Sequence, residues 1–337
     1  MIRKIEKYDK SGMYKIYDKW PDIADESYNR SFVPIDYKNI NHIVFAGMGG
    51  SGTIGSVFES ILSKTNLHVS IVKGYLLPKT VDKNTLVVAT SISGNTVETL
   101  EILKTAQKSK CKLIGFSSGG KLEKFCKNHK IEFRDIPQFH SPRASFPSFL
   151  YSMLNILDPM IPIKKQDVKE SIKSLRKIRE KISSKNISEN NPSLELANWI
   201  SGIPLIYYPF GLQSAAIRFK NSLQENAKIQ AITEDVLEMS HNGIVAWEKP
   251  TICKPILLQG KDDYIKTKEH WRIIKQYFQD NSIDYFEIFS INGHILSKLI
   301  ALIYQLDYSS IYLAINSKTE PSPVKSIEYV KYRLNKK

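Results

Sequence analysis

The sequence predicts an α/β protein made of two doubly wound lobes, each with a mainly parallel sheet flanked by helices. In the first half of the chain, short runs rich in β-branched residues alternate with helical patterns, which is typical of a parallel sheet wrapped by helices. The second half repeats this alternation. The length of 337 residues also leaves room for two domains, each with its own core.

The first lobe is expected to contain five strands and three helices. The strands are predicted at residues 42–46, 68–72, 86–90, 112–116 and 131–136. The helices are predicted at residues 52–63, 97–108 and 121–128. A proline-punctuated segment, 158–162, then precedes a strongly charged helical pattern over residues 166–185. The domain boundary is therefore placed here, which gives lobes of residues 1–158 and 159–337.

The second lobe is expected to repeat this order. Its strands are predicted at residues 204–208, 228–232, 255–259 and 284–288. Its helices are predicted at residues 212–225, 267–278, 295–316 and 324–334. Within residues 1–40, the pairs Trp20-Pro21 and Val33-Pro34 are expected to interrupt any helix.

Composition argues against several classes of protein. The net charge is +14, but the lysines are scattered and no block of five basic residues occurs, so no nucleic-acid partner is expected. No apolar run reaches the ~18 residues of a membrane-spanning helix, and the N-terminus lacks the apolar core of a signal peptide. Cys111, Cys126 and Cys253 show neither metal-site nor disulfide spacing. These features favour a cytoplasmic protein without a membrane or metal partner.

A glycine-rich turn follows the first predicted strand. Residues 47–52 read Gly-Met-Gly-Gly-Ser-Gly, which satisfies the dinucleotide fingerprint letter by letter. The second strand, however, ends in Val-Lys-Gly and lacks the carboxylate that would hold a ribose. Thr53 stands where a Walker loop needs lysine. Gly49, Gly50 and Ser51 remain candidates for binding an anion at a helix N-terminus, and the alternative is a tight turn that binds nothing.

A second loop of similar character follows the third predicted strand. Ser91, Ser93 and Thr96 crowd the start of a helix, and three hydroxyls exceed what capping one helix requires. They suit a phosphate monoester, whose oxygens accept several hydrogen bonds. Because both loops follow strands of one doubly wound sheet, they are expected to converge at its ligand crevice. The pair of loops favours a phosphosugar over a dinucleotide, and no cofactor is expected.

The strings Gly-Met-Gly-Gly-Ser-Gly and Ser-Ile-Ser-Gly-Asn-Thr together resemble the sugar isomerase (SIS) domain. Within that superfamily the chain resembles the bifunctional phosphoglucose/phosphomannose isomerases of archaea and some bacteria. The resemblance continues over residues 141–147, 218–221, 225–228, 239–242, 245–248, 323–324 and 327–331. It implies two SIS-type lobes and an isomerase of carbohydrate metabolism, in glycolysis and gluconeogenesis. Glucose 6-phosphate, mannose 6-phosphate or both would be interconverted with fructose 6-phosphate through a cis-enediolate.

Four residues are expected to carry this chemistry. A carboxylate is the natural base for moving a proton between C1 and C2, and the resemblance assigns that role to Glu225. Arg143 would stabilise the enediolate oxygens or hold the base in place. His241 is the candidate for ring opening, and in relatives this histidine comes from the neighbouring subunit, which implies a homodimer. Lys331 matches a family lysine that reaches the active site, so the choice between His241 and Lys331 stays open.

Two positions depart from the family pattern, and two other functions compete. Relatives commonly show tyrosine where this chain has Ile92, and glutamate where it has Gly243. Both departures bear on substrate preference more than on proton transfer. The alternatives are a non-catalytic SIS-domain regulator that binds a phosphosugar, and an isomerase of another sugar phosphate. The regulators normally append a basic helix-turn-helix, for which residues 1–40 are too short and too irregular.

Overall fold

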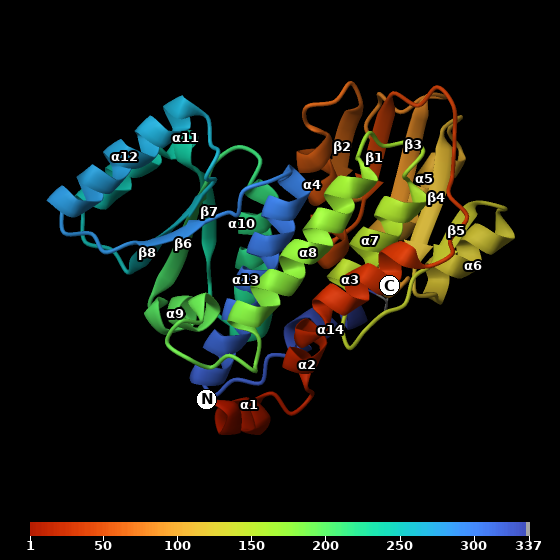
Figure 1. Ribbon diagram of the computed structural model, residues 1–337. Coiled ribbons are helices and arrows are strands. Elements are labelled where there is room, and N and C mark those ends of the chain that lie inside the picture. The colour runs from red at the N-terminus through yellow and green to blue at the C-terminus, as the bar shows by residue number, and fades with distance from the viewer. Residues whose placement is uncertain (335–337) are drawn as a thin grey trace.

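The computed structural model describes residues 1–334 and arranges them in two lobes, each built on a parallel sheet (Figure 1). The first sheet has the order β2-β1-β3-β4-β5 and the second has the order β7-β6-β8-β9. All pairings within both sheets are parallel. The predicted fold class is therefore confirmed.

The strand order determines where a ligand can bind. In the first lobe the chain goes from β1 outward to β2, and then returns to the other side of β1 as β3. In the second lobe β6, β7 and β8 repeat this course. The carboxyl ends of β1 and β3, and those of β6 and β8, therefore flank the switch points where open α/β sheets bind ligands.

The first lobe contains the predicted elements with small shifts at their ends. Its strands are β1 His42–Ala46, β2 His68–Val72, β3 Thr85–Thr90, β4 Lys112–Ser117 and β5 Glu132–Asp135. Its helices are α4 Gly49–Leu62, α5 Val97–Gln107, α6 Gly120–Asn128 and α7 Phe146–Ile156, of which α7 was not predicted. The charged helix α8, Lys165–Ile182, follows.

The second lobe also keeps the predicted alternation. Its strands are β6 Ile203–Tyr208, β7 Ile232–Asp235, β8 Cys253–Gln259 and β9 Phe286–Phe289. Its helices are α9 Pro192–Trp199, α10 Gln213–Ser222, α11 Val236–Met239, α12 Ile265–Asp280, α13 Ile295–Asn316 and α14 Lys325–Leu334. A π-helical turn, η1 Leu223–Ala227, extends α10, and a 3₁₀ turn, η2 Gly243–Glu248, follows α11. Helices α9 and α11 were not predicted.

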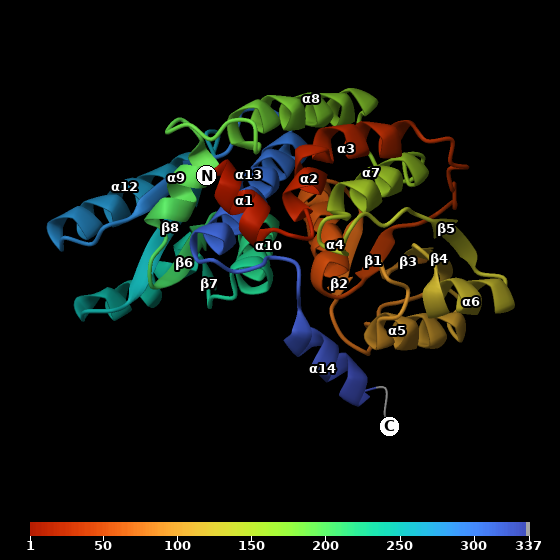
Figure 2. The same ribbon diagram turned by 90° about the horizontal axis from the view of Figure 1, so that it is seen from below.

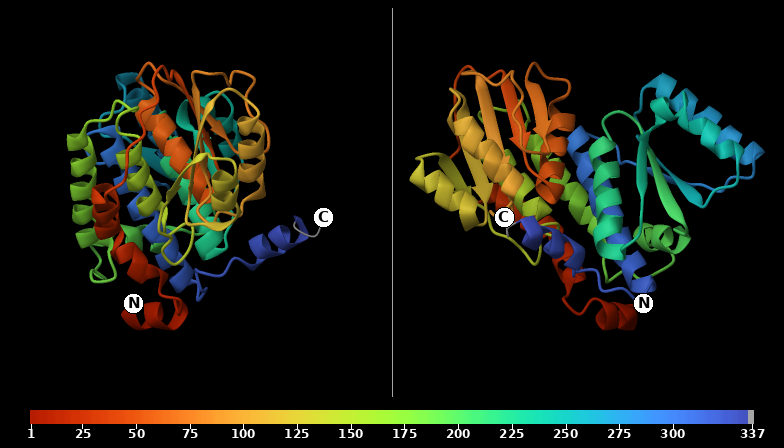
Figure 3. Two further views of the ribbon diagram at one scale, coloured as in Figure 1. Left: turned by 90° about the vertical axis from the view of Figure 1, so that its right-hand side faces the viewer. Right: turned by 180° about the vertical axis from the view of Figure 1, so that it is seen from behind.

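Helix α13 joins the two lobes. It is buried along nearly its whole length and packs against α8, α9, α10 and α4, between the two sheets (Figures 1 and 3). One hydrophobic cluster accordingly runs from Phe45 of β1 through Leu299 of α13 to Ile206 of β6. The lobes thus share a core, and the predicted boundary at residues 158–159 stays a prediction.

The N-terminal segment differs from the prediction. It forms α1 Ile2–Tyr8, α2 Met13–Asp18 and α3 Trp20–Asn29. The expected interruption at Trp20-Pro21 is present, because α2 ends at Asp18, but the pair opens a new helix that was not predicted. Pro21 lies in the first turn of α3, where a missing N–H removes no intrahelical hydrogen bond. Trp20 is fully buried, stacks on Tyr17 and Tyr304 at 4.4 and 5.3 Å, and donates from Nε1 to the Ala144 carbonyl at 2.9 Å.

The strand predicted at residues 228–232 is also misplaced, because β7 begins only at Ile232. Lys228 ends the π-helical turn in the left-handed conformation, with φ of 60°, and this conformation cannot continue into a strand. At the other end of the chain, α14 stands away from the body on an extended linker (Figures 2 and 3). None of its described residues is buried.

Helices long and apolar enough to cross a membrane do not occur among residues 1–334.

The Trp20 packing leads to a stability prediction. Replacing Trp20 by alanine leaves a cavity between α3, α7 and α13, and is expected to cost about 3–5 kcal/mol of unfolding free energy in denaturant titrations. Trp199→Ala is the matched control, because Trp199 is only half-buried at the rim of the second lobe. A loss for Trp20→Ala no larger than that for Trp199→Ala would contradict the predicted contribution of Trp20 to stability.

Candidate active site

The glycine-rich turn forms one wall of the site. Gly47 is required at its position, because a Cβ there would lie 2.9 Å from the Thr90 carbonyl oxygen at the end of β3. Helix α4 then begins at Gly49, three residues earlier than predicted. A Cβ on Gly49 would meet nothing within 4 Å, so open space lies above the first turn of the helix. The N–H groups of Gly49 and Gly50 therefore face a cavity, whereas those of Ser51 and Gly52 donate to the Met48 carbonyl.

The serine/threonine loop forms the adjacent wall. The two loops are joined because the Ile92 N–H donates to Ser51 Oγ at 3.3 Å. Ser93 and Thr96 line the cavity. Ser91 does not, because it is buried behind the loop and donates its hydroxyl to Thr96 Oγ1 at 2.9 Å. The predicted convergence of the loops is thus seen, with Ser91 supporting Thr96 rather than facing the cavity.

Two adjoining cavities meet at this wall. The loop cavity, of about 570 Å³, is lined by Gly49, Gly50, Ser51, Ser93, Thr96, Arg143, Glu225, Lys331 and neighbouring residues. The helix cavity, of about 780 Å³, is lined by Gly49, Asn221, Gln224, Glu225, Lys228 and residues 323–327. Glu225 and Gly49 line both cavities. The junction of the cavities therefore brings the glycine-rich turn and the serine/threonine loop close to a carboxylate.

Glu225 owes its place to the π-helical turn. The turn extends α10 by five residues in which hydrogen bonds span five residues instead of four. Such a turn changes the direction of the side chains that follow it, and π turns occur frequently at functional sites. Its neighbour in the turn, Asn226, is fully buried, whereas the Glu225 side chain keeps 27% of its surface exposed. The carboxylate is thus held at the cavity wall while remaining accessible.

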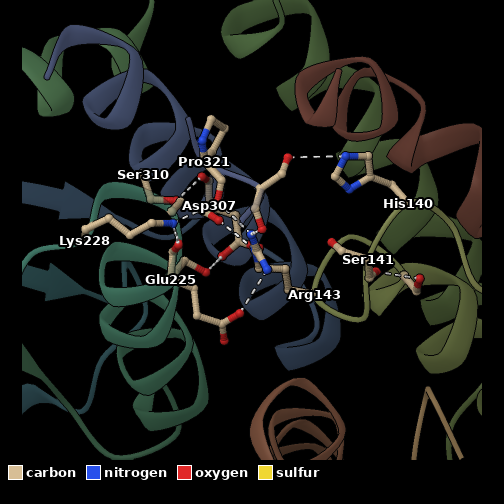
Figure 4. A network of polar contacts seen from close by, with 12 residues as sticks. His140, Ser141, Arg143, Glu225, Lys228, Asp307, Ser310 and Pro321 are labelled. Carbon is tan, nitrogen blue, oxygen red and sulfur yellow. Dashed lines mark hydrogen bonds and ion pairs between the residues drawn. The ribbon is translucent and has the colours of Figure 1, made fainter. Parts of the chain in front are cut away.

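Arg143 reaches this carboxylate from the first lobe (Figure 4). Its Nη1 donates to Glu225 Oε2 at 3.1 Å, and its Nε donates to Asn226 Oδ1 at 2.7 Å. Its Nη2 donates to the carbonyls of Pro321 and Ser322 at 2.8 and 2.9 Å. Arg143 is 6% exposed and anchors both Glu225 and the linker to α14.

A buried ion pair lies behind Arg143. Arg218 donates to Asp307 Oδ2 from both Nε and Nη2, at 3.0 and 2.6 Å, and also donates to the Arg143 carbonyl at 2.9 Å. Ser222 donates to the other Asp307 oxygen at 2.7 Å. Burial alone would lower the pKa of Arg218, but the charge of Asp307 outweighs it and raises that pKa. The Arg218 guanidinium therefore stays charged and holds the backbone at Arg143.

Lys228 makes a second link to the C-terminal linker. Its Nζ donates to the Glu225 carbonyl and to the Pro321 carbonyl, the latter at 3.2 Å. Burial, followed by the nearby Arg143 charge, lowers the pKa of Lys228. Arg143 and Lys228 thus both donate hydrogen bonds to backbone carbonyls of the linker that precedes α14.

His241 and Lys331 have different positions. Lys331 lies on α14 and lines the loop cavity. His241 is exposed on the turn after α11 and lines neither cavity. Helix α11 lies on the outer side of the second lobe, away from α14 (Figure 1). One chain therefore brings Glu225, Arg143 and Lys331 together, but leaves His241 elsewhere.

Several residues of the site were not singled out from the sequence. Asp307, Ser310, Lys228 and Gln224 belong to this group. The sequence could have pointed to Asp307, because it is a lone carboxylate within the apolar stretch of α13. Such a carboxylate is costly to bury unless it is paired, so its position indicates a buried partner. Among residues 1–334, no three His, Cys, Asp or Glu side chains form a group that can hold a metal ion.

Comparison with known proteins identifies the family. A model of the SIS domain matches residues 36–150, and a model of the bacterial phospho-glucose isomerase C-terminal SIS domain matches residues 189–334. The bifunctional phosphoglucose/phosphomannose isomerase of Caldicellulosiruptor bescii is 31% identical over 90% of this chain and 92% of its own length. The chain belongs to the bifunctional phosphoglucose/phosphomannose isomerase family. The resemblance read from the sequence is thereby confirmed.

Other similarities agree with this family and show its breadth. The enzyme of the same name from Aquifex aeolicus is 30% identical over 96% of this chain and 97% of its own length. A D-glucosamine-6-phosphate 4-epimerase of Sulfolobus acidocaldarius is 30% identical over 69% of this chain and 72% of its own. A crystal structure of a hypothetical protein from Thermus thermophilus has a TM-score of 0.75 at 15% identity, covering 99% of this chain and 92% of that one. This last similarity supports the two-lobed fold alone.

The buried pair behind the site leads to a second stability prediction. Asp307→Asn leaves the Arg218 charge buried without its partner, and is expected to cost about 3–5 kcal/mol of unfolding free energy. Asp22→Asn is the control, because Asp22 pairs with Arg179 at 2.6 Å on the surface and should contribute less than about 1 kcal/mol. Denaturant titration of both variants tests this, and equal losses would contradict a special role for the buried pair.

Proposed function

We propose that this protein is an aldose–ketose isomerase that interconverts glucose 6-phosphate, mannose 6-phosphate or both with fructose 6-phosphate through a cis-enediolate. The observation that carries the proposal is the meeting of Glu225 Oε2 and Arg143 Nη1 at 3.1 Å, on the wall of a cavity lined by glycine and hydroxyl loops. The isomerase names of the related proteins support it.

The phosphate is assigned to the loop cavity. The amides of Gly49 and Gly50 lie at the N-terminus of α4, where the helix dipole favours an anion. Ser51 offers its hydroxyl, because its N–H already donates to the Met48 carbonyl at 3.1 Å. The hydroxyls of Ser93 and Thr96 supply further donors. A phosphate held there directs the sugar chain along the wall toward Glu225.

The reacting carbons are assigned to the junction of the two cavities. Glu225 takes the proton from one of C1 and C2 and returns it to the other, which a carboxylate can do without a cofactor. The negative charge that develops on the sugar oxygens lies beside the fixed positive charge of Arg143. If the enediolate rotates about its C2–C3 bond before it regains the proton, both C2 epimers are served.

Ring opening requires an acid that can reach the ring oxygen. Lys331 lines the loop cavity within the same chain, and we infer that His241 of a partner subunit provides an imidazole in a homodimer. We further assign the enzyme to carbohydrate metabolism in the cytoplasm, in glycolysis and gluconeogenesis, which the three free cysteines support.

One further candidate has a specific observation in its favour. The similarity to a D-glucosamine-6-phosphate 4-epimerase supports a role on another sugar phosphate. The deciding experiment incubates the protein separately with fructose 6-phosphate and with D-glucosamine 6-phosphate and resolves the products. Formation of glucose 6-phosphate or mannose 6-phosphate supports the proposal, whereas conversion of the amino sugar alone supports the alternative. Binding without turnover of either would favour a regulator.

Removing the base tests the assigned mechanism. Glu225→Gln keeps the size of the side chain but cannot take a proton, so kcat for fructose 6-phosphate should fall by about 10²–10⁴-fold with KM nearly unchanged. Glu269→Gln is the control, because Glu269 pairs with Lys266 on the surface of α12. Turnover of Glu225→Gln within about tenfold of the parent would reject Glu225 as the base.

Mixing two inactive variants tests the shared site. His241→Ala and Glu225→Gln homodimers should each be inactive. A mixed dimer has one site with both changes and one with neither, so random re-association should restore about a quarter of the parental activity. Absence of recovery in mixtures shown to contain mixed dimers would place His241 and Glu225 in the same subunit's site. An active His241→Ala homodimer would assign ring opening to Lys331 instead.

A further inference from the structure

The guanidinium of Arg143 has nearly all of its donors occupied. A guanidinium carries five N–H groups, and four of those of Arg143 have partners. Nε–H donates to Asn226, and the two N–H groups of Nη2 donate to the carbonyls of Pro321 and Ser322. One N–H of Nη1 donates to Glu225. The second N–H of Nη1 meets no acceptor within the described part of the chain.

The unused donor belongs to the nitrogen nearest the reacting position. Nη1 is the nitrogen that contacts Glu225, and both side chains line the loop cavity. The other two nitrogens of Arg143 donate to Asn226 and to the carbonyls of the linker before α14. The guanidinium is therefore held at all three nitrogens, and a single N–H of Nη1 remains for a ligand in the cavity.

The orientation of Asn226 determines this arrangement. Its amide is fully buried between Arg143 and Ser310, accepting at Oδ1 from Nε at 2.7 Å and donating from Nδ2 to Ser310 Oγ at 2.8 Å. The single hydroxyl proton of Ser310 is already donated to the Asp307 carbonyl at 2.6 Å. Ser310 can therefore only accept from Asn226.

The opposite orientation of the amide is unfavourable. With the amide turned over, Nδ2 would face the N–H of Arg143, and Oδ1 would face an oxygen of Ser310 that has no proton to give. Both contacts are buried, so neither mismatch can be relieved by solvent. The direction of each hydrogen bond that links the Asp307 carbonyl, Ser310, Asn226 and Arg143 is consequently fixed.

We propose that Asn226 and Ser310 are positioning residues that hold Arg143 so that one N–H of Nη1 meets the oxygen on which negative charge develops. This inference rests on the proposed function, because the charge arises only if a proton is removed beside Arg143. A donor that is fixed before the reaction needs no reorganisation when the charge appears. Asn226 and Ser310 act through Arg143 and touch no substrate themselves.

Two neighbouring serines of α13 provide a matched test. Ser310→Ala removes the acceptor that orients Asn226, and is expected to lower kcat for fructose 6-phosphate by about tenfold with KM within about twofold. Ser309→Ala is the control, because Ser309 is equally buried but donates to the Gln305 carbonyl of its own helix. Equal kcat values for the two variants would overturn the proposal.

Two changes at Asn226 separate positioning from packing. Asn226→Leu keeps the volume but offers Arg143 no acceptor, so kcat should fall by about 10²-fold. Asn226→Asp keeps an oxygen that accepts from Arg143 Nε, so part of that loss should be recovered. Equal losses in kcat for Leu and Asp would overturn the proposal, because acceptor chemistry at this position would then be irrelevant.

A measurement without turnover keeps this inference separate from the proposed function. The Nε–H of Arg143 is buried and hydrogen-bonded, so it should give a protected ¹⁵N–¹H signal that Arg143→Lys removes. This signal should lose protection in Asn226→Leu and keep it in Asn226→Asp and Ser309→Ala. Lack of isomerisation by the parent would reject the proposed function only, whereas a signal indifferent to Asn226→Leu would reject the positioning role.

Discussion

The site depends on the buried contact between Arg218 and Asp307, because this pair ties the two lobes together at the point where the chemistry is assigned. Asp307 is fully buried in α13, and Arg218 reaches from it to the backbone of Arg143 in the first lobe. Taking two charges out of water is costly, and the cost is offset only when the remaining donors and acceptors are satisfied. Ser222 and Tyr17 complete the hydrogen bonds of Asp307.

The same pair explains why functional residues from distant parts of the chain keep a common geometry. The glycine and hydroxyl loops are fixed by the carboxyl ends of β1 and β3, whereas Glu225 is fixed by the π-helical turn that follows α10. These supports belong to different sheets, so the interface between the lobes sets the distance between the two loops and Glu225. A shared core around α13, with a paired charge inside it, provides a rigid interface of this kind.

The sequence predicted the features that arise from local pattern. The strands of the first sheet and helix α13 follow from periodicity, and the two loops follow from glycine and hydroxyl residues at strand ends. Features that depend on tertiary contacts were missed. Helix α3 begins at Trp20, which packs between aromatic rings, and Lys228 ends a π-helical turn that no side-chain period encodes. The roles of Glu225 and Arg143 came from family resemblance, and their contact became visible only in three dimensions.

The position of α14 follows from the same network and bears on how substrate enters. Arg143 and Lys228 both donate to the linker before α14, so the residues that meet at Glu225 also fix the start of the helix. The helix itself has no buried residue, yet Ile327 and Lys331 line the cavity opposite the loops. A segment anchored at one end, with few buried contacts beyond it, has the low local stability expected of an element that moves. The firm anchor thus preserves the reacting geometry, while the exposed helix leaves the cavity open to substrate.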